Sequence, residues 1–300
     1  MTPGFLAVDS GGSGLRVVLG TAGGDGDGPR VLGRRASREA VRTDTRGIDP
    51  GHLLGQLLPM AESLREETGV VRIGTVVVGA AGLATLGDAL RAELPGALAR
   101  DLGARTVALV ADAVTAYVGA LGPRTGAVVA AGTGLIATGT DLERWYRADG
   151  WGHLLGDCGG GAWIGRAGLE AALRAHDGRL GGSAALLARA EERFGPVAGL
   201  PGRIYPRTDR PAVLASFAPE VCPSGGEPLV AVTGGLLKLG DALVVPLEEE
   251  LAKRLPQARR TAAEGDPLHG SVRIASDLAT GSFTLPGDEK MLWVTADPDG

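Results

Sequence analysis

One pattern occurs twice in this chain and constrains the fold more than any other feature. It consists of a short apolar run, a turn of glycine with serine or threonine, and a second apolar run that returns. The first copy is Phe5–Val8, Asp9-Ser-Gly-Gly-Ser-Gly14 and Leu15–Leu19; the second is Ala127–Ala131, Gly132-Thr-Gly134 and Leu135–Thr138. Glycine adopts the positive φ that a tight turn requires, so both copies are predicted to be β-hairpins.

Apolar runs alternate with segments of helical spacing along the rest of the chain. Further strands are expected at Ile73–Val78, Thr106–Val110 and Leu229–Val232. Helices are expected at His52–Glu67, Leu86–Ala99, Asp112–Leu121, Ala162–His176, Ser183–Phe194, Arg210–Phe217, Leu236–Leu255 and Pro267–Leu278. This alternation predicts an α/β protein with a mainly parallel sheet in each lobe and antiparallel hairpins at the start. The length of 300 residues is enough for two lobes of ordinary size.

Composition excludes several classes of protein. A net charge of −5 argues against a general nucleic-acid surface. Two cysteines are too few for a disulfide framework or for an iron–sulfur cluster held by one chain, and the four histidines lack zinc-ligand spacing. Neither a signal peptide nor an apolar run of membrane-spanning length is recognised. We therefore expect a soluble, cytoplasmic protein that binds neither nucleic acid nor membrane.

The two hairpin turns are candidate phosphate-binding loops. Each offers backbone N–H groups that no side chain blocks, together with a hydroxyl from Ser10 or Ser13 in one turn and Thr133 in the other. Backbone nests of this kind bind phosphate oxygens, and two facing hairpins could hold one polyphosphate from both sides. Asp9, at the mouth of the first turn, is placed to hold Mg²⁺ through water, although an Asx-turn explains it equally well.

Asp112 follows the strand Val107–Val110 and opens a helix. It could be a helix N-cap, which is a common role for aspartate. It could also be a general base, because α/β proteins place their ligands at the carboxyl ends of strands. The sequence offers no histidine at a comparable strand end, so Asp112 is the preferred candidate base.

The segment Asp149–Gly165 holds seven glycines and two tryptophans in seventeen residues. This composition suits a wall that a ligand approaches closely, with an aromatic face and a carboxylate turned toward it; the alternative is a glycine-rich turn before a helix. Thr233-Gly-Gly235 repeats the strand–glycine–helix pattern. It could lie under a nucleotide base or simply start a helix.

Together these segments resemble the N-acetylglucosamine kinase and BadF/BadG/BcrA/BcrD-type ATPase family, in the actin/hexokinase/Hsp70 superfamily. Asp9–Arg16 resembles the first phosphate loop, Ala111-Asp-Ala113 the catalytic-base motif and Gly132-Thr-Gly134 the second phosphate loop. Gly150–Gly165 is similar to the sugar-binding stretch and Val230–Leu237 to the adenosine motif. The resemblance covers nearly the whole chain, and Gly150–Gly165 is its most specific part.

The resemblance implies two actin-like, ribonuclease H-like lobes around a central cleft for nucleotide and sugar. Residues 1–115 would form the N-terminal lobe, completed by the C-terminal helix at 266–280, and residues 116–265 the C-terminal lobe. It also implies ATP-dependent phosphorylation of an amino sugar, N-acetylglucosamine at its 6-hydroxyl in the first instance, by a homodimer.

The resemblance also assigns roles to residues. Asp112 would be the catalytic base, and Asp9 would hold Mg²⁺. The phosphates of ATP would contact Gly11, Gly12, Ser13, Gly132, Thr133 and Gly134, and the adenosine Gly234, Gly235 and Leu236. The sugar would contact Gly82, Asp112, Trp151, Gly152 and Asp157.

The chain departs from the family pattern at two positions in these motifs. Cys158 stands where the family has glutamate, and Gly14 stands where the first loop often has lysine. Glucosamine and N-acetylmuramic acid are alternative substrates. A catalytically degenerate sugar sensor and an ATPase that activates a redox partner are alternative functions, the last disfavoured because neither cysteine lies in a cluster-binding pattern.

Overall fold

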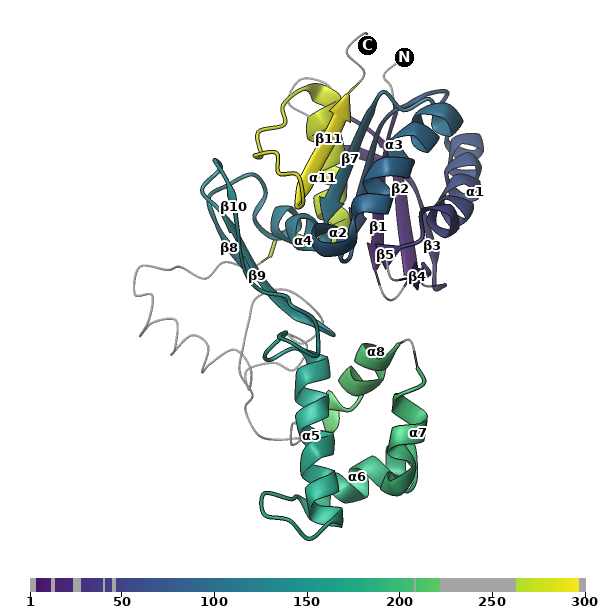
Figure 1. Cartoon of the computed structure of the whole chain (residues 1–300). Helices are drawn as coiled ribbons and strands as arrows, with labels where there is room; N and C mark the ends of the chain where they lie inside the picture. The colour runs from purple at the N-terminus through teal and green to yellow at the C-terminus, as the bar shows by residue number, and fades with distance from the viewer. Residues whose placement is uncertain are drawn as a thin grey trace. The chain divides into compact units, whose positions relative to one another are not determined.

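The computed structural model describes residues 4–11, 14–23, 28–39, 41–44, 47–207, 209–221 and 263–296 (Figure 1). The chain forms two compact units. The first comprises Met1–Val128, Thr138–Tyr146 and Ala262–Gly300, and the second comprises Val129–Ala137 and Arg147–Thr261. The predicted lobe boundary between residues 115 and 116 falls inside helix α4 (Asp112–Leu121), all of which belongs to the first unit.

A six-stranded sheet is the centre of the first unit, with the strand order β11-β7-β6-β1-β2-β3. Its strands are β1 (Gly4–Gly11), β2 (Gly14–Thr21), β3 (Arg30–Ser37), β6 (Ile73–Ala80), β7 (Thr106–Ala111) and β11 (Leu292–Ala296). The first predicted hairpin is confirmed, because β1 and β2 pair antiparallel from Gly4↔Thr21 to Gly11↔Gly14.

The expectation of a mainly parallel sheet is wrong for this sheet. Only the β1–β6 and β6–β7 pairs are parallel, whereas β1–β2, β2–β3 and β7–β11 are antiparallel. The sequence analysis missed β3 and β11. Both lie at sheet edges. The side chains of β3 are partly exposed, so its sequence lacks the continuous apolar run of a central strand, whereas β11 has a short apolar run that was not assigned to a strand.

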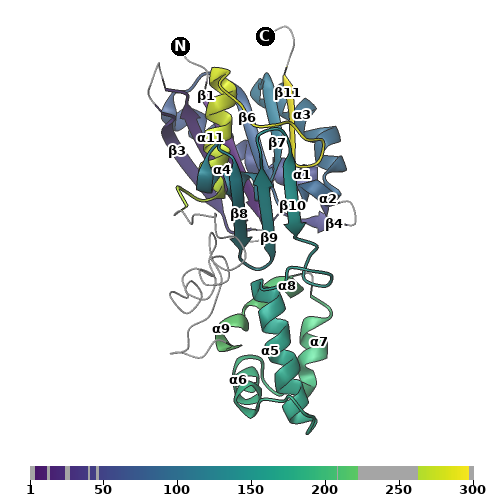
Figure 2. The ribbon, with the colours of Figure 1, turned by 90° about the vertical axis from the view of Figure 1, so that its left-hand side faces the viewer.

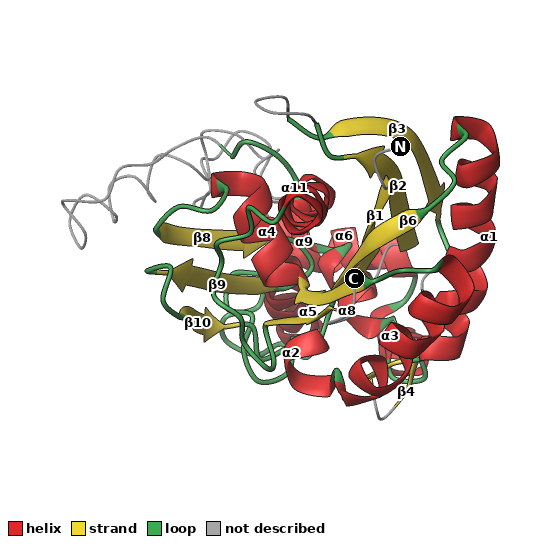
Figure 3. Cartoon of the chain, turned by 90° about the horizontal axis from the view of Figure 1, so that it is seen from above, coloured by secondary structure: helices red, strands yellow, loops and turns green. Residues whose placement is uncertain are grey.

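Helices cover both faces of this sheet (Figure 3). Alternate residues of a strand point to opposite faces, and Leu6, Val8, Val76 and Val78 share one apolar core with α1 (Pro50–Thr68) and α3 (Asp88–Leu102). The opposite face is covered by α11 (Pro267–Thr280), which packs against α4, β1 and β6. A segment from near the end of the chain thus completes the first unit.

Glycine allows α4 and α11 to approach closely. A Cβ on Gly119 would lie 2.2 Å from the carbonyl oxygen of Asp266, and one on Gly270 would lie 1.9 Å from that of Thr115. Both distances are far shorter than real contacts, so each helix presents bare backbone to the other. The helix pair fixes Asp266, the N-cap of α11, beside the sheet.

Two smaller sheets accompany the large one. β4 (Thr43–Asp44) pairs with β5 (Gly47–Ile48), and α2 (Leu83–Leu86) precedes α3. β8 (Gly126–Ala131), β9 (Leu135–Thr140) and β10 (Trp145–Asp149) form a sheet in the order β10-β9-β8. The second predicted hairpin is therefore confirmed as two neighbouring strands, while β10 was not foreseen.

The second unit is mainly helical in its described part (Figure 2). It contains α5 (Gly161–His176), α6 (Ala184–Phe194), η1 (Val197–Gly199), α7 (Leu200–Ile204), α8 (Arg210–Ala215) and α9 (Ala218–Val221). Its core includes Leu169, Leu200, Leu214 and Phe217. A Cβ on Gly165 would lie 1.8 Å from the Leu214 carbonyl oxygen, so this glycine of the Asp149–Gly165 segment admits the backbone of α8.

The structure bears out most expected helices within a few residues: Asp112–Leu121 matches α4 at both ends, and Ala162–His176 matches α5 with one residue added. Gly87 divides the segment expected at Leu86–Ala99 into the end of α2 and the start of α3. The strand expected at Leu229–Val232 and the helix expected at Leu236–Leu255 lie outside the described residues. Within the described part of the chain, no helix combines the length and apolar character needed to cross a membrane.

Candidate functional site

Three parallel strands of the large sheet end side by side, and their carboxyl ends bring predicted site residues together. Ser10 of β1 pairs with Ala80 of β6, and Ala80 pairs with Ala111 of β7. Asp112 is the next residue after β7, and Gly82 follows β6 by two positions. Asp9, Gly82 and Asp112, which are far apart in the sequence, therefore lie at one edge of the sheet, where α/β proteins place their ligands.

Asp9 belongs to a charged cluster at this edge. Arg16, its partner across the hairpin, donates from Nε and Nη2 to Asp9 Oδ2 at 2.9 and 2.5 Å, and from Nη1 to Asp266 Oδ2 at 2.7 Å. Burial lowers the pKa of the Arg16 guanidinium, but the two carboxylates outweigh this and raise it. In Asp266, burial raises the pKa, while the N–H of His269 and the Arg16 guanidinium hold it below its ordinary value.

Both hydrogen bonds that Arg16 donates to Asp9 end on one oxygen, Oδ2; within the described residues, Oδ1 accepts no hydrogen bond. No group of three His, Cys, Asp or Glu side chains among those residues could hold a metal ion. Mg²⁺ bound to a nucleotide usually takes only one or two protein carboxylates and otherwise phosphate and water oxygens. One carboxylate with a remaining oxygen at the strand end is therefore a donor set that fits Mg²⁺.

The turn that follows Asp9 is built around backbone. Ser10 is almost completely buried, and its Oγ has no hydrogen-bond partner among the described residues. A buried hydroxyl without a partner is costly, which suits a place that receives a phosphate oxygen or a water. A Cβ on Gly11 would meet nothing within 4 Å, so the described protein leaves its surroundings open. Gly12 and Ser13 lie outside the described residues.

Gly14 closes this turn in a backbone conformation with φ of +131°. A Cβ there would lie 2.0 Å from the carbonyl oxygen of Ser37 in β3. Strand β3 therefore requires glycine at position 14, where the family often has lysine.

Asp112 is the first residue of α4 and is exposed. The N-cap of α4 is Ala111, which makes no side-chain cap, so the N-cap alternative for Asp112 does not describe the observed helix start. Asp112 Oδ1 accepts the N–H of Ala113 at 2.9 Å. The positive end of the helix favours the ionised carboxylate, the form that can accept a proton.

In the second unit, the Gly132-Thr-Gly134 turn packs directly on the second half of the Asp149–Gly165 segment, where α5 begins. Gly161 N–H donates to the Gly132 carbonyl and Ala162 N–H to the Thr133 carbonyl, both at 2.8 Å. A Cβ on Gly134 would lie 2.4 Å from Asp157 Oδ2. The predicted second phosphate loop and the predicted sugar segment are therefore one structural element.

Two carboxylates order the glycine-rich segment from within. Asp149, at φ +59°, accepts the N–H of Asp157 at 2.7 Å and that of Cys158 at 2.9 Å. Asp157, at φ +56°, accepts the Gly152 N–H at 3.0 Å. These bonds close the loop on itself and place Gly152 and Asp157 beside the phosphate turn.

The pKa values of the two carboxylates are shifted in opposite directions. Burial raises the pKa of Asp149, but the backbone N–H groups of Cys158 and Asp157 outweigh it and lower the pKa. Burial raises the pKa of Asp157, the charge of Asp149 adds to this, and the Gly152 N–H opposes it.

The outer side of this loop is aromatic and exposed. Trp151 is 62% exposed, and the Arg147 guanidinium carbon lies 4.2 Å from the centre of its ring. Cys158, the residue that replaces the family's glutamate, is an exposed free thiol. Arg16, Asp266 and Arg147 were not among the predicted site residues. The hairpin pattern could have indicated the cross-strand pairing of Arg16 with Asp9.

Gly82 is described; it precedes α2 and has a left-handed φ of +74°. A Cβ at this position would meet nothing within 4 Å. The predicted adenosine residues Gly234, Gly235 and Leu236 lie outside the described residues.

These features define the class of the protein. A mixed α/β fold with a glycine-rich hairpin at the start of its central sheet is the fold of the actin-like ATPases, and solved structures share it. A protein from Chromobacterium violaceum assigned as an N-acetylglucosamine kinase matches with a TM-score of 0.60 and 23% identity, covering 90% of this chain and 98% of that one. One from Porphyromonas gingivalis with the same assignment matches with a TM-score of 0.55 and 22% identity, over 72% and 71% of the two chains.

The chain belongs to the BadF/BadG/BcrA/BcrD ATPase family, whose model matches residues 6–224. A curated relative, the N-acetylmuramic acid/N-acetylglucosamine kinase of Clostridium acetobutylicum, is 42% identical over 74 residues. That match spans 24% of this chain and 24% of the relative.

Proposed function

We propose that this protein transfers the γ-phosphoryl group of ATP to an amino sugar, with the 6-hydroxyl of N-acetylglucosamine as the first candidate acceptor. The observation that carries the proposal is the meeting of Asp9, Ser10 and Asp112 at the carboxyl edge of the central sheet. The names of the relatives from Clostridium acetobutylicum and Chromobacterium violaceum support the choice of an amino sugar.

Asp112 would act as the general base. Its carboxylate takes the proton of the sugar hydroxyl while the hydroxyl oxygen forms a bond to the γ-phosphorus, and ADP leaves as the bond to its terminal oxygen breaks. The exposed position at the start of α4 leaves the carboxylate accessible to a sugar. Phosphoryl transfer depends mainly on positioning and charge neutralisation, so the fixed helix start matters as much as the basicity.

The two glycine turns would hold the phosphates. Packing within the described residues does not require glycine at Gly11 or Gly132, because a Cβ at either position would meet nothing within 4 Å. Room for a ligand's approach accounts for both. Gly12, Ser13, Thr133 and Gly134 would contribute the other N–H and hydroxyl groups. Asp9 would hold Mg²⁺, which neutralises phosphate charge when it is bound.

The sugar would lie against Gly82 and the loop that carries Trp151, Gly152 and Asp157. Asp157 is 9% exposed and already accepts the Gly152 N–H. We propose that it both fixes this N–H and offers its other oxygen to a hydroxyl. Contacts of adenosine with Gly234, Gly235 and Leu236, a homodimeric state and a cytoplasmic location are proposals that rest on the family resemblance alone.

N-acetylmuramic acid is a second candidate, favoured by one observation. Arg147 lies over the ring of Trp151, so a cation stands beside the proposed sugar wall. The lactyl carboxylate of N-acetylmuramic acid is the group that such a cation would recognise. Glucosamine carries a positive amine instead and has no such support.

A coupled ADP-release assay with the three amino sugars tests the proposal, comparing wild type with Asp112→Asn. Loss of the base should lower kcat by roughly 10²- to 10⁴-fold with little change in the KM for ATP. Asp88→Asn is the matched control, because Asp88 also stands at the first position of an exposed helix start, that of α3. If no sugar stimulates ADP release, the kinase proposal fails and a sugar sensor gains; if Asp112→Asn keeps near-full activity, Asp112 is not the base.

A further inference from the structure

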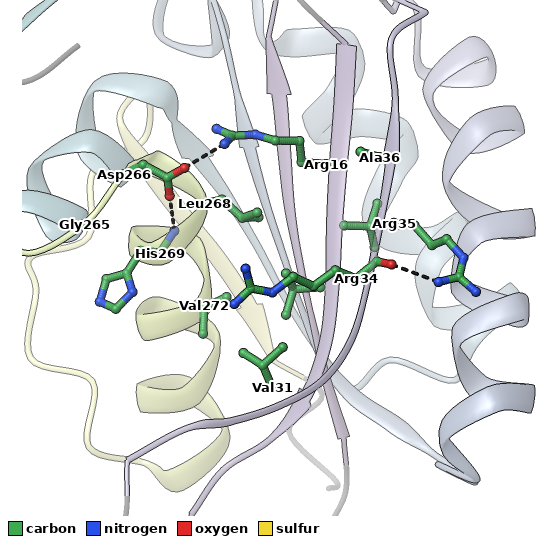
Figure 4. Close-up of a pocket in the computed structure, with 12 residues that line it drawn as sticks. Arg16, Val31, Arg34, Arg35, Ala36, Gly265, Asp266, Leu268, His269 and Val272 are labelled. Atoms are coloured by element: carbon green, nitrogen blue, oxygen red, sulfur yellow. Dashed lines mark hydrogen bonds and ion pairs between the residues drawn. The ribbon is translucent and has the colours of Figure 1, made fainter. Parts of the chain in front are cut away.

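A groove lies on the first unit between strands β2 and β3 and helix α11 (Figure 4). Its volume is about 630 Å³. Pockets that bind small molecules have volumes of roughly 300–1,000 Å³, so the groove is of the right size for one. Apart from Arg16, which holds Asp9, its lining residues have no part in the proposed kinase chemistry.

The floor of the groove is apolar. Val18 and Val272 are buried, and Val31 and Leu268 are partly buried. An apolar floor gives a ring or short carbon chain a surface to cover, and covering it removes apolar area from water.

Two neighbouring arginines of β3 behave differently. Arg35 points toward α1, where it forms an ion pair with Glu67 and donates to Ser63 Oγ at 3.2 Å. Arg34 has the opposite orientation, as successive strand residues do, and extends across the groove toward Val272 (Figure 4). Within the described residues, no carboxylate forms an ion pair with Arg34.

The other charged groups at the groove are engaged with one another. Asp266 accepts from Arg16 at 2.7 Å and from the backbone N–H of His269 at 2.9 Å, and Arg16 also holds Asp9. The ring of His269 is at the exposed rim. Arg16 is shared between the Asp9 and Asp266 carboxylates, whereas the Arg34 guanidinium is the cation that faces the apolar floor.

We propose that this groove binds a small organic anion, with its phosphate or carboxylate group on Arg34 and its apolar or ring body on Val18, Val31 and Val272. A guanidinium pairs with either oxyanion through two parallel N–H donors, and the apolar floor selects ligands that carry more than the anion itself. The residues that would hold the anion are not those assigned to ATP or to the sugar, so its binding requires neither of them.

Isothermal titration of the full chain, without ATP or sugar, tests this with three probes: phenyl phosphate, benzoate and inorganic phosphate. We expect one of the two ring-bearing anions to bind at least tenfold more tightly than inorganic phosphate, and the comparison between them identifies the preferred oxyanion. Arg34→Gln should weaken that binding at least tenfold. Arg35→Gln, the neighbour that points to α1, should change it less than twofold.

Arg34 is exposed, so the variant is expected to fold, and matching unfolding temperatures of the two variants would confirm this. The proposal is overturned if neither ring-bearing anion binds the wild type more tightly than inorganic phosphate, or if Arg34→Gln binds as the wild type does. Because these measurements use no ATP, they stand or fall separately from the ADP-release assay that tests the kinase.

Discussion

Substituting the second glycine of the Gly132-Thr-Gly134 turn should disturb the sugar segment and not only the phosphate loop. A Cβ on Gly134 would lie 2.4 Å from Asp157 Oδ2, whereas ordinary contacts begin at 3.4 Å. Asp157 must therefore retreat by about 1 Å, and it cannot do so freely because it is buried and holds the Gly152 N–H.

Overpacking of this kind costs about 1–3 kcal/mol. We expect Gly134→Ala to lower the free energy of unfolding by about that amount. If the strain is relieved by moving Asp157 and Gly152, kcat/KM for the sugar should fall by roughly 5- to 150-fold, the same free energy expressed as a rate ratio. Urea unfolding followed by tryptophan fluorescence measures the first effect, since Trp151 and Trp163 flank the loop. Steady-state kinetics measure the second.

Gly132→Ala is the matched control, because a Cβ there would meet nothing within 4 Å. It should leave the unfolding free energy nearly unchanged, even if it alters the KM for ATP. The double variant Gly134→Ala/Asp157→Ala removes the opposing carboxylate and should be less destabilised than the sum of its parts. Equal stability of the Gly132→Ala and Gly134→Ala variants would refute the reasoning.

Two further predictions concern the loop and the first turn. The pKa of Asp149 is lowered in the folded protein, because its carboxylate accepts the N–H groups of Asp157 and Cys158. These bonds stabilise the fold at pH values above the ordinary carboxyl pKa of about 3.9. Their contribution is lost as the pH falls through the pKa of the folded state. Asp149→Asn, which tolerates the positive φ, should therefore show a smaller loss of stability below about pH 4 than wild type in acid unfolding curves; identical curves would contradict this. Gly14→Lys, which restores the family's frequent residue, should destabilise the protein because its Cβ would lie 2.0 Å from the Ser37 carbonyl oxygen and its φ is +131°. A thermal unfolding temperature equal to or above that of wild type would show that β3 can yield.

Most of the secondary structure was predictable because it depends on local pattern. The hairpin at Asp9–Gly14 follows from apolar runs around glycines, and α4 follows from apolar spacing that starts at Asp112. The strands that were missed, β3, β10 and β11, are short or partly exposed and owe their place to pairing with neighbours. Pairing is a long-range property, and periodicity within a short window does not contain it.

The candidate site was predictable as a set of residues but not as an arrangement. Asp9, Asp112 and Gly132-Thr-Gly134 could each be named from glycine content and strand ends. That Asp112 begins the helix instead of capping it, and that Asp9 shares Arg16 with Asp266 near the end of the chain, depends on contacts between distant segments.

The sequence by itself determined where backbone must turn tightly, which carboxylates follow strands, and to which family the pattern of motifs is similar. Only the tertiary structure decided what those features touch. It showed that Gly165 admits the backbone of α8, that Gly134 rests on Asp157, and that Arg34 faces a groove while Arg35 pairs with α1. The physical reason is that turn preferences and periodicity act between near neighbours, whereas close packing and ion pairing are fixed only when the folded chain brings remote residues together.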